Sequence, residues 1–271
     1  MSSNSIKYLA CELTGRCQLR CVHCYADSAP GGDHGIMTDG DWLRVIDEAA
    51  MLGIGMIQFI GGEPTMRPAL GEFVKHTLSA GLRVEVFTNL FHMTDTLWAL
   101  AERPGVSLAT SYYSDLASQH DSVTKRPGSH AGTRANIAEA VRREIPIRVS
   151  IVDRGDGQRV SAARTELTNL GVTRIKIGHQ RAVGRGEPTG SPDLSQLCGR
   201  CGQGVAVGSD GDVTPCVIGR WLVVGNVRQG SLRDIVDGPA MADAMTQIRR
   251  TESGGDKKDD KSEDDGCSPA P

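Results

Sequence analysis

The feature that most constrains this chain is a repeated alternation of short apolar segments with amphipathic helical segments, which continues to about residue 180. Residues 6–13 form the first apolar segment, and the helical pattern that follows begins at a cap formed by Thr38. Strands that alternate with helices in this way form a parallel sheet with the helices packed outside it. The alternation therefore predicts an α/β fold, built either as a partial barrel or as an open doubly wound sheet.

Six such units can be followed along the chain, and several of their strands end in residues that carry chemistry. In folds of this type the active residues lie at the carboxyl ends of the strands. A cysteine-rich segment follows the first strand, a Gly-Gly-Glu-Pro turn follows the second, and Asn89 ends the third. We expect strands at residues 6–13, 56–60, 83–88, 106–112, 147–152 and 174–177, and helices from Thr38 and at residues 70–79, 95–101, about 133–143 and 162–170.

Composition and charge restrict the classes of protein to which the chain can belong. Apolar residues make up 39% and charged residues 23% of the 271 residues, which is typical of a globular protein. The formal net charge of −3 gives no indication of a nucleic-acid partner. The sequence has no run of about 18 apolar residues, and its N-terminus is too polar for a signal peptide. We therefore expect a cytoplasmic protein that binds neither nucleic acid nor membrane.

Eight cysteines in such a protein need an explanation, because disulfides are disfavoured in the cytosol. Metal or redox chemistry is then the better interpretation. Cys11 lies within the first expected strand, where we expect a buried, reduced thiol. The remaining cysteines fall in an early group and a late group, with one more near the C-terminus: Cys17, Cys21 and Cys24; Cys198, Cys201 and Cys216; and Cys267.

The early group places Cys17, Cys21 and Cys24 within eight residues, on a loop that leaves a strand. Three thiols are one ligand short of a closed tetrahedral zinc site or of a fully ligated iron–sulfur cluster. One interpretation is a structural zinc ion completed by His23 or Cys11, or simply three reduced thiols. The other is a [4Fe–4S] cluster with one iron left open to bind a small molecule.

The Cys-x3-Cys-x2-Cys spacing, together with Gly61-Gly62-Glu63-Pro64 at the end of the second strand, resembles the radical S-adenosylmethionine (radical SAM) superfamily. The resemblance covers roughly residues 6–180 of an expected core domain at residues 1–190 and implies a partial (β/α)6 TIM-type barrel. It implies a [4Fe–4S] cluster and S-adenosylmethionine as cofactors, with the open iron bound by the amino and carboxylate groups of the latter. One electron would split the sulfonium C–S bond, and the 5′-deoxyadenosyl radical would remove a hydrogen atom from a substrate.

The resemblance also implies which residues hold S-adenosylmethionine. Gly61 and Gly62 would let the backbone approach its methionine part, and Glu63 or a backbone carbonyl would accept a hydrogen bond from its amine. The ring of His23 or Tyr25 would lie against the adenine, although both rings can equally pack the cluster loop. The implied set of cofactor-binding residues is His23, Tyr25, Gly61, Gly62, Glu63, Pro64, Asn89, Ser111 and Arg181.

Three members of this set follow or lie in later strands. Asn89 and Ser111 match positions that often contact the sugar or carboxylate of the cofactor in this family. Arg181 follows the sixth strand, where related enzymes often place an arginine near the cofactor carboxylate. A guanidinium suits that position because it pairs with a carboxylate through two hydrogen bonds, although a solvated surface arginine is the alternative.

The late cysteines point to a second metal site. The turn at residues 210–212 predicts a tight hairpin that brings Cys216 back toward Cys198 and Cys201. This stretch resembles the start of the SPASM/twitch extension of radical SAM enzymes, which implies an auxiliary iron–sulfur cluster, while a zinc knuckle is the alternative. The later cysteine run of the full extension is absent, so Cys267, substrate or water would complete the site.

Residues 191–250 would then form a small auxiliary domain, with short strands at residues 205–207 and 221–224 and a final helix near residues 241–250. Residues 251–271 carry 7 acidic and 3 basic side chains and no periodic apolar pattern. Such a composition predicts a disordered acidic tail.

The resemblance suggests an enzyme that cross-links or oxidises side chains of a ribosomally made peptide, since the late cysteine region looks like that of bacterial peptide-maturation enzymes. The first alternative is a radical dehydrogenase or skeleton-modifying enzyme that acts on a sugar or cyclitol in antibiotic biosynthesis. The second is a non-enzymatic metal protein that binds a partner through its acidic tail. Either enzyme needs a one-electron reductant such as flavodoxin or ferredoxin.

His120 and Asp121 could form a proton-transfer pair near the substrate, or make a loop hydrogen bond or helix cap.

Overall fold

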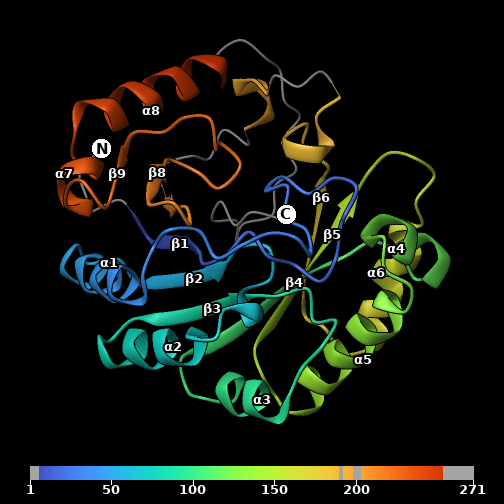
Figure 1. Ribbon diagram of the computed structural model, residues 1–271. Coiled ribbons are helices and arrows are strands. Elements are labelled where there is room, and N and C mark those ends of the chain that lie inside the picture. The colour runs from blue at the N-terminus through green and yellow to red at the C-terminus, as the bar shows by residue number, and fades with distance from the viewer. Residues whose placement is uncertain (1–5, 189–191, 198–202, 253–271) are drawn as a thin grey trace.

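A single nine-stranded sheet forms the centre of the protein, shown in Figure 1. The computed structural model describes residues 6–188, 192–197 and 203–252. The strands are β1 (Tyr8–Glu12), β2 (Met56–Ile60), β3 (Arg83–Phe87), β4 (Val106–Tyr112), β5 (Ile147–Asp153), β6 (Arg174–His179), β7 (Gly204–Val207), β8 (Asp212–Thr214) and β9 (Gly225–Asn226). Their order in the sheet is β6-β5-β4-β3-β2-β1-β7-β8-β9.

The strand order distinguishes between the two expected α/β architectures. From β1 to β6 each strand pairs in parallel with the next strand along the chain. A doubly wound sheet reverses its direction of growth at one strand, whereas this part of the sheet grows in one direction only. The first six units therefore form the expected partial barrel.

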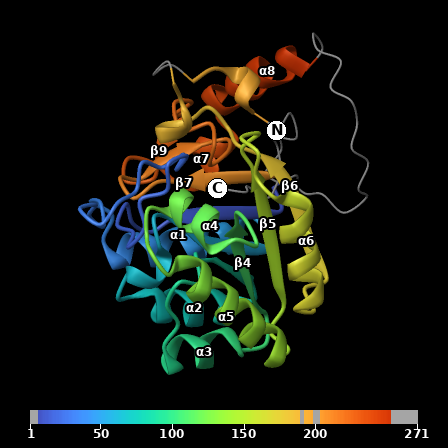
Figure 2. The same cartoon turned by 90° about the vertical axis from the view of Figure 1, so that its right-hand side faces the viewer.

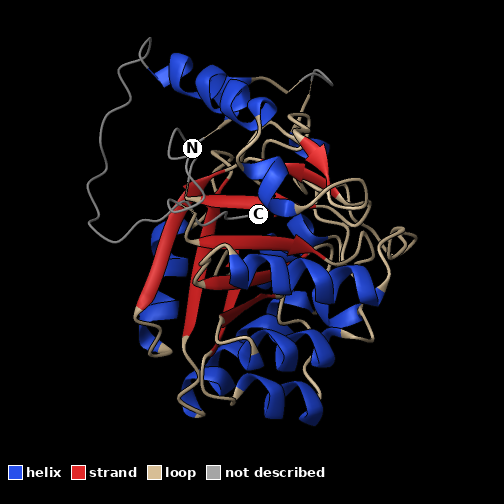
Figure 3. Cartoon of the chain, turned by 90° about the vertical axis from the view of Figure 1, so that its left-hand side faces the viewer, coloured by secondary structure: helices blue, strands red, loops and turns tan. Residues whose placement is uncertain are grey.

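Helices pack against the strands of the barrel, as Figure 3 shows. Within the part of the chain that the structure describes, no helix is long and apolar enough to cross a membrane. The α-helices are α1 (Asp39–Met51), α2 (Leu70–Ser79), α3 (Asp95–Ala101), α4 (Ala117–Thr124), α5 (Ser129–Arg142), α6 (Val160–Asn169), α7 (Leu232–Val236) and α8 (Pro239–Glu252). Short 3-10 turns are η2 (Pro64–Met66), η3 (Gly184–Gly186) and η4 (Leu194–Gln196).

Local sequence signals placed most of the barrel elements correctly. The Thr38 hydroxyl accepts a hydrogen bond from Asp41 N at 3.1 Å, and the Asp41 carboxylate accepts one from Thr38 N at 3.0 Å. This capping box begins α1 at the expected residue. Strands β2 and β4 and helices α2 and α3 have the expected bounds, and the remaining expected barrel elements differ at one or both ends.

Three elements were not expected, and one expectation was wrong. The sequence does not predict helix α4, because two of its three buried positions, His120 and Thr124, are polar and give no apolar period. Helix α7 and strand β9 were also unexpected. Residues 221–224 do not form the expected strand; the pairing partner of β8 is β9, whose Gly225 packs against Ile235 and gives no apolar signal.

The C-terminal residues extend the barrel sheet instead of forming a separate one. Strand β7 pairs in parallel with β1, and β7 and β8 form the expected antiparallel hairpin at Gly211, whose φ is +90°. Helix α8 lies beyond this hairpin, on the side away from α3, in Figures 1 and 2. The division into domains at residue 190 stays a prediction, and most of the expected tail lies outside the described residues.

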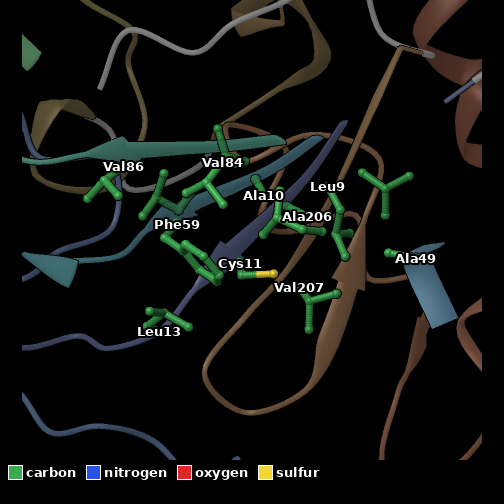
Figure 4. Close-up of a cluster of buried hydrophobic side chains, with 14 of the residues drawn as sticks. Leu9, Ala10, Cys11, Leu13, Ala49, Phe59, Val84, Val86, Ala206 and Val207 are labelled. Atoms are coloured by element: carbon green, nitrogen blue, oxygen red, sulfur yellow. The ribbon is translucent and has the colours of Figure 1, made fainter. Parts of the chain in front are cut away.

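The face of β1 that meets the helices is apolar. Cys11 lies opposite Phe59 of β2 and Val207 of β7 in the register, and Figure 4 shows these side chains together with Leu13. The Cys11 side chain is fully buried and its thiol is free. The expectation of a reduced core cysteine is thus confirmed.

The interior of the barrel instead holds an ion pair. The Arg148 guanidinium of β5 donates to both Glu85 carboxylate oxygens of β3, at 2.8 and 3.0 Å, and stacks over the Phe87 ring. Gln58 of β2 donates to the same carboxylate. Since both charges are almost fully buried, each depends on the other for compensation.

We expect Arg148→Ala to lower the free energy of unfolding by about 3–5 kcal/mol, because it leaves the Glu85 carboxylate buried without a counter-charge. Urea unfolding followed by circular dichroism measures this change. The matched control is the double variant Glu85→Leu with Arg148→Met, which removes both charges and should cost much less. Equal losses in the single and double variants would contradict this account of the barrel interior.

Candidate functional site

The cysteine loop leaves the carboxyl end of β1 and is held by backbone hydrogen bonds. Cys17 N donates to Ala29 O at 3.1 Å, which closes the loop on itself. Arg20 N and Val22 N donate to Thr124 O and Val123 O, at 3.0 and 2.9 Å. The loop is therefore fastened both to its own return segment and to the end of α4.

All three cysteines of this loop line one cavity at the carboxyl ends of the strands. The cavity lies between the cysteine loop and the ends of β2, β3 and β4. The expected residues that line it are Cys17, Cys21, Cys24, His23, Tyr25, Gly61, Gly62, Asn89 and Ser111. His120, a candidate for proton transfer, lines it as well. Lining residues that the sequence did not indicate as site residues are Leu19, Ser28, Ile60, Phe87, Tyr113, Thr124, Thr133 and Arg185.

Burial disfavours the charged forms of the titratable groups in this cavity. It raises the pKa of Cys17 well above its usual range and that of Cys21 to about 12. It lowers the pKa of His23 to about 4, helped by Arg154 and Arg185. Thiols in such surroundings become thiolates when a metal binds them, because the metal supplies the missing positive charge.

The cavity also contains buried polar atoms that need a partner. Among the described residues, no hydrogen-bond partner reaches His23 Nδ1, Ser28 Oγ or His120 Nε2. Buried polar groups in folded proteins are nearly always hydrogen-bonded. The cavity therefore fits a ligand that carries polar groups of its own.

Gly61 and Gly62 hold the end of β2 against the start of the cysteine loop. A Cβ on Gly61 would lie 2.6 Å from Thr14 O, and one on Gly62 would lie 2.4 Å from Arg16 O. Gly61 also has a φ of +144°. Gly62 N donates to Thr14 O at 2.6 Å. The glycines are thus required by the close approach of two backbone segments, in addition to their proposed place beside a cofactor.

Glu63 and Pro64 are absent from the cavity lining. Pro64 begins the 3-10 turn η2. Glu63 is fully buried and accepts hydrogen bonds from Thr65 N and Oγ1, Thr88 Oγ1 and Asn89 N, at 2.7–3.2 Å. Burial raises its pKa, and these hydrogen bonds partly offset the rise. The Glu63 carboxylate thus links the end of β2 to the end of β3 through hydrogen bonds. Because it is already occupied by them, the backbone of the turn is the better candidate for contact with a cofactor amine.

Asn89 is positioned by this carboxylate. Its side-chain Oδ1 accepts hydrogen bonds from Gln18 Nε2 at 3.1 Å and from Phe91 N at 2.9 Å, and its Nδ2 lies 3.7 Å from Cys17 Sγ. Asn89 is therefore part of the cavity wall beside the first cysteine, as expected for the end of the third strand.

The arginine of the cavity is Arg185, and Arg181 is not among the lining residues. Arg185 donates to Cys21 O at 2.9 Å and to Ser28 O at 2.6 Å, and its backbone N donates to Cys24 O at 3.0 Å. The structure thus places Arg185, four residues after Arg181, at the cavity, and the expected contact between an arginine and the cofactor carboxylate stays a prediction.

Tyr25 lies between the two cysteine regions. Its hydroxyl is buried, which raises its pKa, and the nearby Glu12 carboxylate raises it further. Charge on Cys24 or on Cys216 would act on it in the same direction. Cys216 is buried near the end of the β7–β8 hairpin. The other expected ligands of the auxiliary site, Cys198, Cys201 and Cys267, lie outside the described residues.

His120 and Asp121 lie in α4 and are not directly hydrogen-bonded to each other, since 3.9 Å separates His120 Nδ1 from Asp121 Oδ1. Asp121 accepts hydrogen bonds from Gly128 N and His130 N, at 2.7 and 2.8 Å. It therefore caps α5, and the helix-cap interpretation is confirmed.

The ring of His120 packs against Tyr113, whose hydroxyl bonds to the Cys21 thiol. Side chains two residues apart in a strand lie on the same face of the sheet, so the expected site residue Ser111 could have pointed to Tyr113 as well.

Comparison with known families identifies the type of protein. A model described as the radical SAM superfamily matches residues 11–157, which carry the cysteine loop and the strands around the cavity. This chain belongs to the radical SAM superfamily. A second model, described as an iron–sulfur cluster-binding domain (SPASM), matches residues 198–268. The expected [4Fe–4S] cluster, S-adenosylmethionine and an auxiliary iron–sulfur cluster are confirmed as cofactors of this family, and the cavity fits the first two.

Individual radical SAM proteins are similar over parts of the chain. An AdoMet-dependent heme synthase of Methanosarcina barkeri is 28% identical over 68% of this chain and 54% of its own length. A PqqA peptide cyclase of Methylocella silvestris is 28% identical over 66% of this chain and 48% of its own. The chain thus spans about half the length of either relative. Streptococcus suis SuiB, solved with S-adenosylmethionine and with its precursor peptide SuiA, shares the fold (TM-score 0.73, 15% identity, 89% of this chain and 68% of that chain).

We expect Gly62→Ala to lower the iron content after anaerobic reconstitution and to lower the free energy of unfolding by about 1–3 kcal/mol, because its Cβ overlaps Arg16 O. Iron analysis and chemical unfolding measure both effects. Gly71→Ala is the matched control, since nothing lies within 4 Å of a Cβ at that helical position. A Gly62→Ala protein with full iron content and stability would contradict the proposed close approach.

We expect Arg185→Ala to retain less iron than the unchanged protein, because the cluster loop loses hydrogen bonds from a charged group to Cys21 O and Ser28 O. Arg181→Ala should retain the normal amount, since Arg181 does not line the cavity. Iron content measured at intervals after gel filtration distinguishes the two variants. If Arg181→Ala loses iron and Arg185→Ala does not, the assignment of the cavity arginine is wrong.

Proposed function

We propose that this chain is a radical SAM enzyme that modifies a ribosomally made peptide by cross-linking or oxidising its side chains. The observation that carries the chemistry is the single cavity that Cys17, Cys21, Cys24, the Gly61–Gly62 backbone and Asn89 line together. When bound, the cluster would supply the electron that splits S-adenosylmethionine and so makes removal of a hydrogen atom from the substrate possible.

The chain's own residues hold and enclose these groups. Cys17, Cys21 and Cys24 would hold the cluster through their three thiolates, one ligand short of full coordination, which would leave room for S-adenosylmethionine to bind to it. The backbone of Gly61 and Gly62 receives the methionine part, while His23, Tyr25 and Ser111 border the space for the adenosine. Arg185 keeps the loop closed through its hydrogen bond to Cys21 O. Apolar walls such as Leu19, Ile60 and Phe87 exclude water from the reacting carbon.

A peptide substrate is supported by the relatives named PqqA peptide cyclase, several of which match at 24–33% identity. A second hollow beside the cavity supports it as well. Gln18 lines this hollow and also donates to Asn89 of the cavity wall at 3.1 Å. Its lining combines apolar side chains with exposed basic ones: Met66, Leu70, Phe91, Leu97 and Leu100, with Lys75 and Arg103. An extended peptide is long enough to reach from this hollow into the cavity.

The auxiliary cluster belongs to the same proposal. Cys198, Cys201 and Cys216 are its proposed ligands from the SPASM region, and Cys267 is the candidate for the fourth. Tyr25 lies near both Cys216 and Cys24, which supports an auxiliary cluster close to the first one. A flavodoxin or ferredoxin is the proposed source of electrons.

A small-molecule substrate is the second candidate, because another relative is named a heme synthase and matches a similar share of the chain. The sugar or cyclitol substrate suggested by the sequence stays a prediction. Peptides encoded beside this gene, or iron coproporphyrin, can therefore be offered to the reconstituted enzyme and analysed by mass spectrometry. Loss of a hydrogen pair from a peptide supports the proposal, while conversion of the porphyrin alone would overturn the peptide assignment.

We expect the reduced, reconstituted enzyme to form 5′-deoxyadenosine from S-adenosylmethionine, and Cys24→Ala to abolish it because one iron loses its ligand. Chromatography of the products measures the yield, and iron analysis is expected to give about eight irons per chain for two four-iron clusters. Cys11→Ala is the matched control: it changes a buried thiol outside the cavity, so the yield should persist. Absence of 5′-deoxyadenosine from the unchanged enzyme would defeat both enzymatic proposals.

A further inference from the structure

His120 lines the cavity, and no hydrogen-bond partner for its buried Nε2 atom is found among the described residues. Its side chain is 1% exposed, and its ring lies between Tyr112, Tyr113 and His130, with ring centroids 5.1–5.4 Å away. The neighbouring rings fix its orientation. The Nε2 atom is therefore free to accept a hydrogen bond from a molecule bound in the cavity.

The hydrogen-bond chain behind His120 determines which of its nitrogens carries the proton. His120 Nδ1 lies 3.2 Å from Ser129 Oγ, and the Ser129 hydroxyl donates to Asp121 Oδ1 at 2.9 Å. The Asp121 carboxylate can only accept, since backbone hydrogen bonds from His130 and Gly128 outweigh its burial and lower its pKa. Ser129 has one hydrogen and gives it to this carboxylate.

Ser129 Oγ consequently accepts a hydrogen bond from Nδ1–H of His120. The Thr124 hydroxyl lies 2.6 Å from Ser129 Oγ and also donates to the carbonyl oxygens of His120 and Asp121, at 3.3 Å each, so it has acceptors of its own and leaves this arrangement unchanged. Burial, together with His130, lowers the pKa of His120 to about 3, so the ring carries one proton only. With that proton on Nδ1, Nε2 has a free lone pair.

We propose that Asp121 and Ser129 lock His120 in the Nδ1–H form, so that its Nε2 accepts a hydrogen bond from an N–H or O–H group of the molecule bound in the cavity. Two molecules can supply such a donor: the adenosyl hydroxyl or amino groups of S-adenosylmethionine, or an amide or hydroxyl of the substrate. This choice of ligands rests on the proposed function, whereas the position of the proton depends only on the chain itself.

The position of the proton can be measured without activity. Long-range ¹H–¹⁵N NMR correlations of the full-length, cluster-loaded protein labelled at histidine should show Nδ1 protonated and Nε2 bare for the signal that disappears in His120→Asn. Ser129→Ala removes the acceptor and should move the proton to Nε2. A proton on Nε2 in the unchanged protein would overturn the inference, even if the enzyme proves fully active.

The role of the lone pair is tested with two variants that differ by one methylene group. Gln can place an amide oxygen near the position of Nε2, whereas Asn reaches only the position of Nδ1. If S-adenosylmethionine supplies the donor, its Kd by equilibrium dialysis rises about tenfold in His120→Asn and is largely restored in His120→Gln. Equal iron content in both variants controls for folding.

If the substrate supplies the donor, both variants bind S-adenosylmethionine normally and form 5′-deoxyadenosine at the normal yield. Modification of the peptide or porphyrin accepted by the unchanged enzyme should then fall in His120→Asn and recover in His120→Gln. Identical behaviour of the two variants in both assays would refute the acceptor role. Failure of the proposed function would appear differently, as an absence of 5′-deoxyadenosine in the unchanged protein.

Discussion

Two short backbone contacts between the end of β2 and the start of the cysteine loop hold the functional cavity together. Gly62 N donates to Thr14 O at 2.6 Å, and Glu63 N donates to Arg16 O at 2.9 Å. These contacts require the absence of a Cβ at Gly62, because a side chain would overlap the carbonyl of Arg16. They place the first cysteine of the loop next to the strand ends, where the chemistry of a parallel barrel is found.

The polar groups around this cavity fall into two kinds with different tasks. Glu63 and the guanidinium of Arg185 are already hydrogen-bonded within the chain, so they maintain the shape of the walls. His23, Ser28 and His120 each have a buried polar atom with no hydrogen-bond partner among the described residues, so these atoms are available to a ligand. A site of this construction is prepared before its cofactor binds, which reduces the reorganisation that binding requires.

Much of the fold and part of the site could be predicted, because the signals involved are local. The Thr38 capping box, the apolar period of α1 and the short apolar run at β2 each depend on neighbouring residues only. Elements stabilised by distant contacts were missed. Helix α4 has a weak apolar period and is held by packing of His120 and by hydrogen bonds to the cysteine loop, which no local pattern reveals.

The sequence by itself determined the family, the close spacing of three thiols after the first strand and a parallel sheet with helices outside it, because spacing and periodicity are properties of the chain alone. Only the tertiary structure decided that Arg185 and not Arg181 reaches the cavity, and that Glu63 binds the end of β3. It also decided that Ser129 stands between His120 and Asp121. Each of these depends on the direction of a side chain across an interface between elements, and a direction in space follows from packing and not from position along the chain.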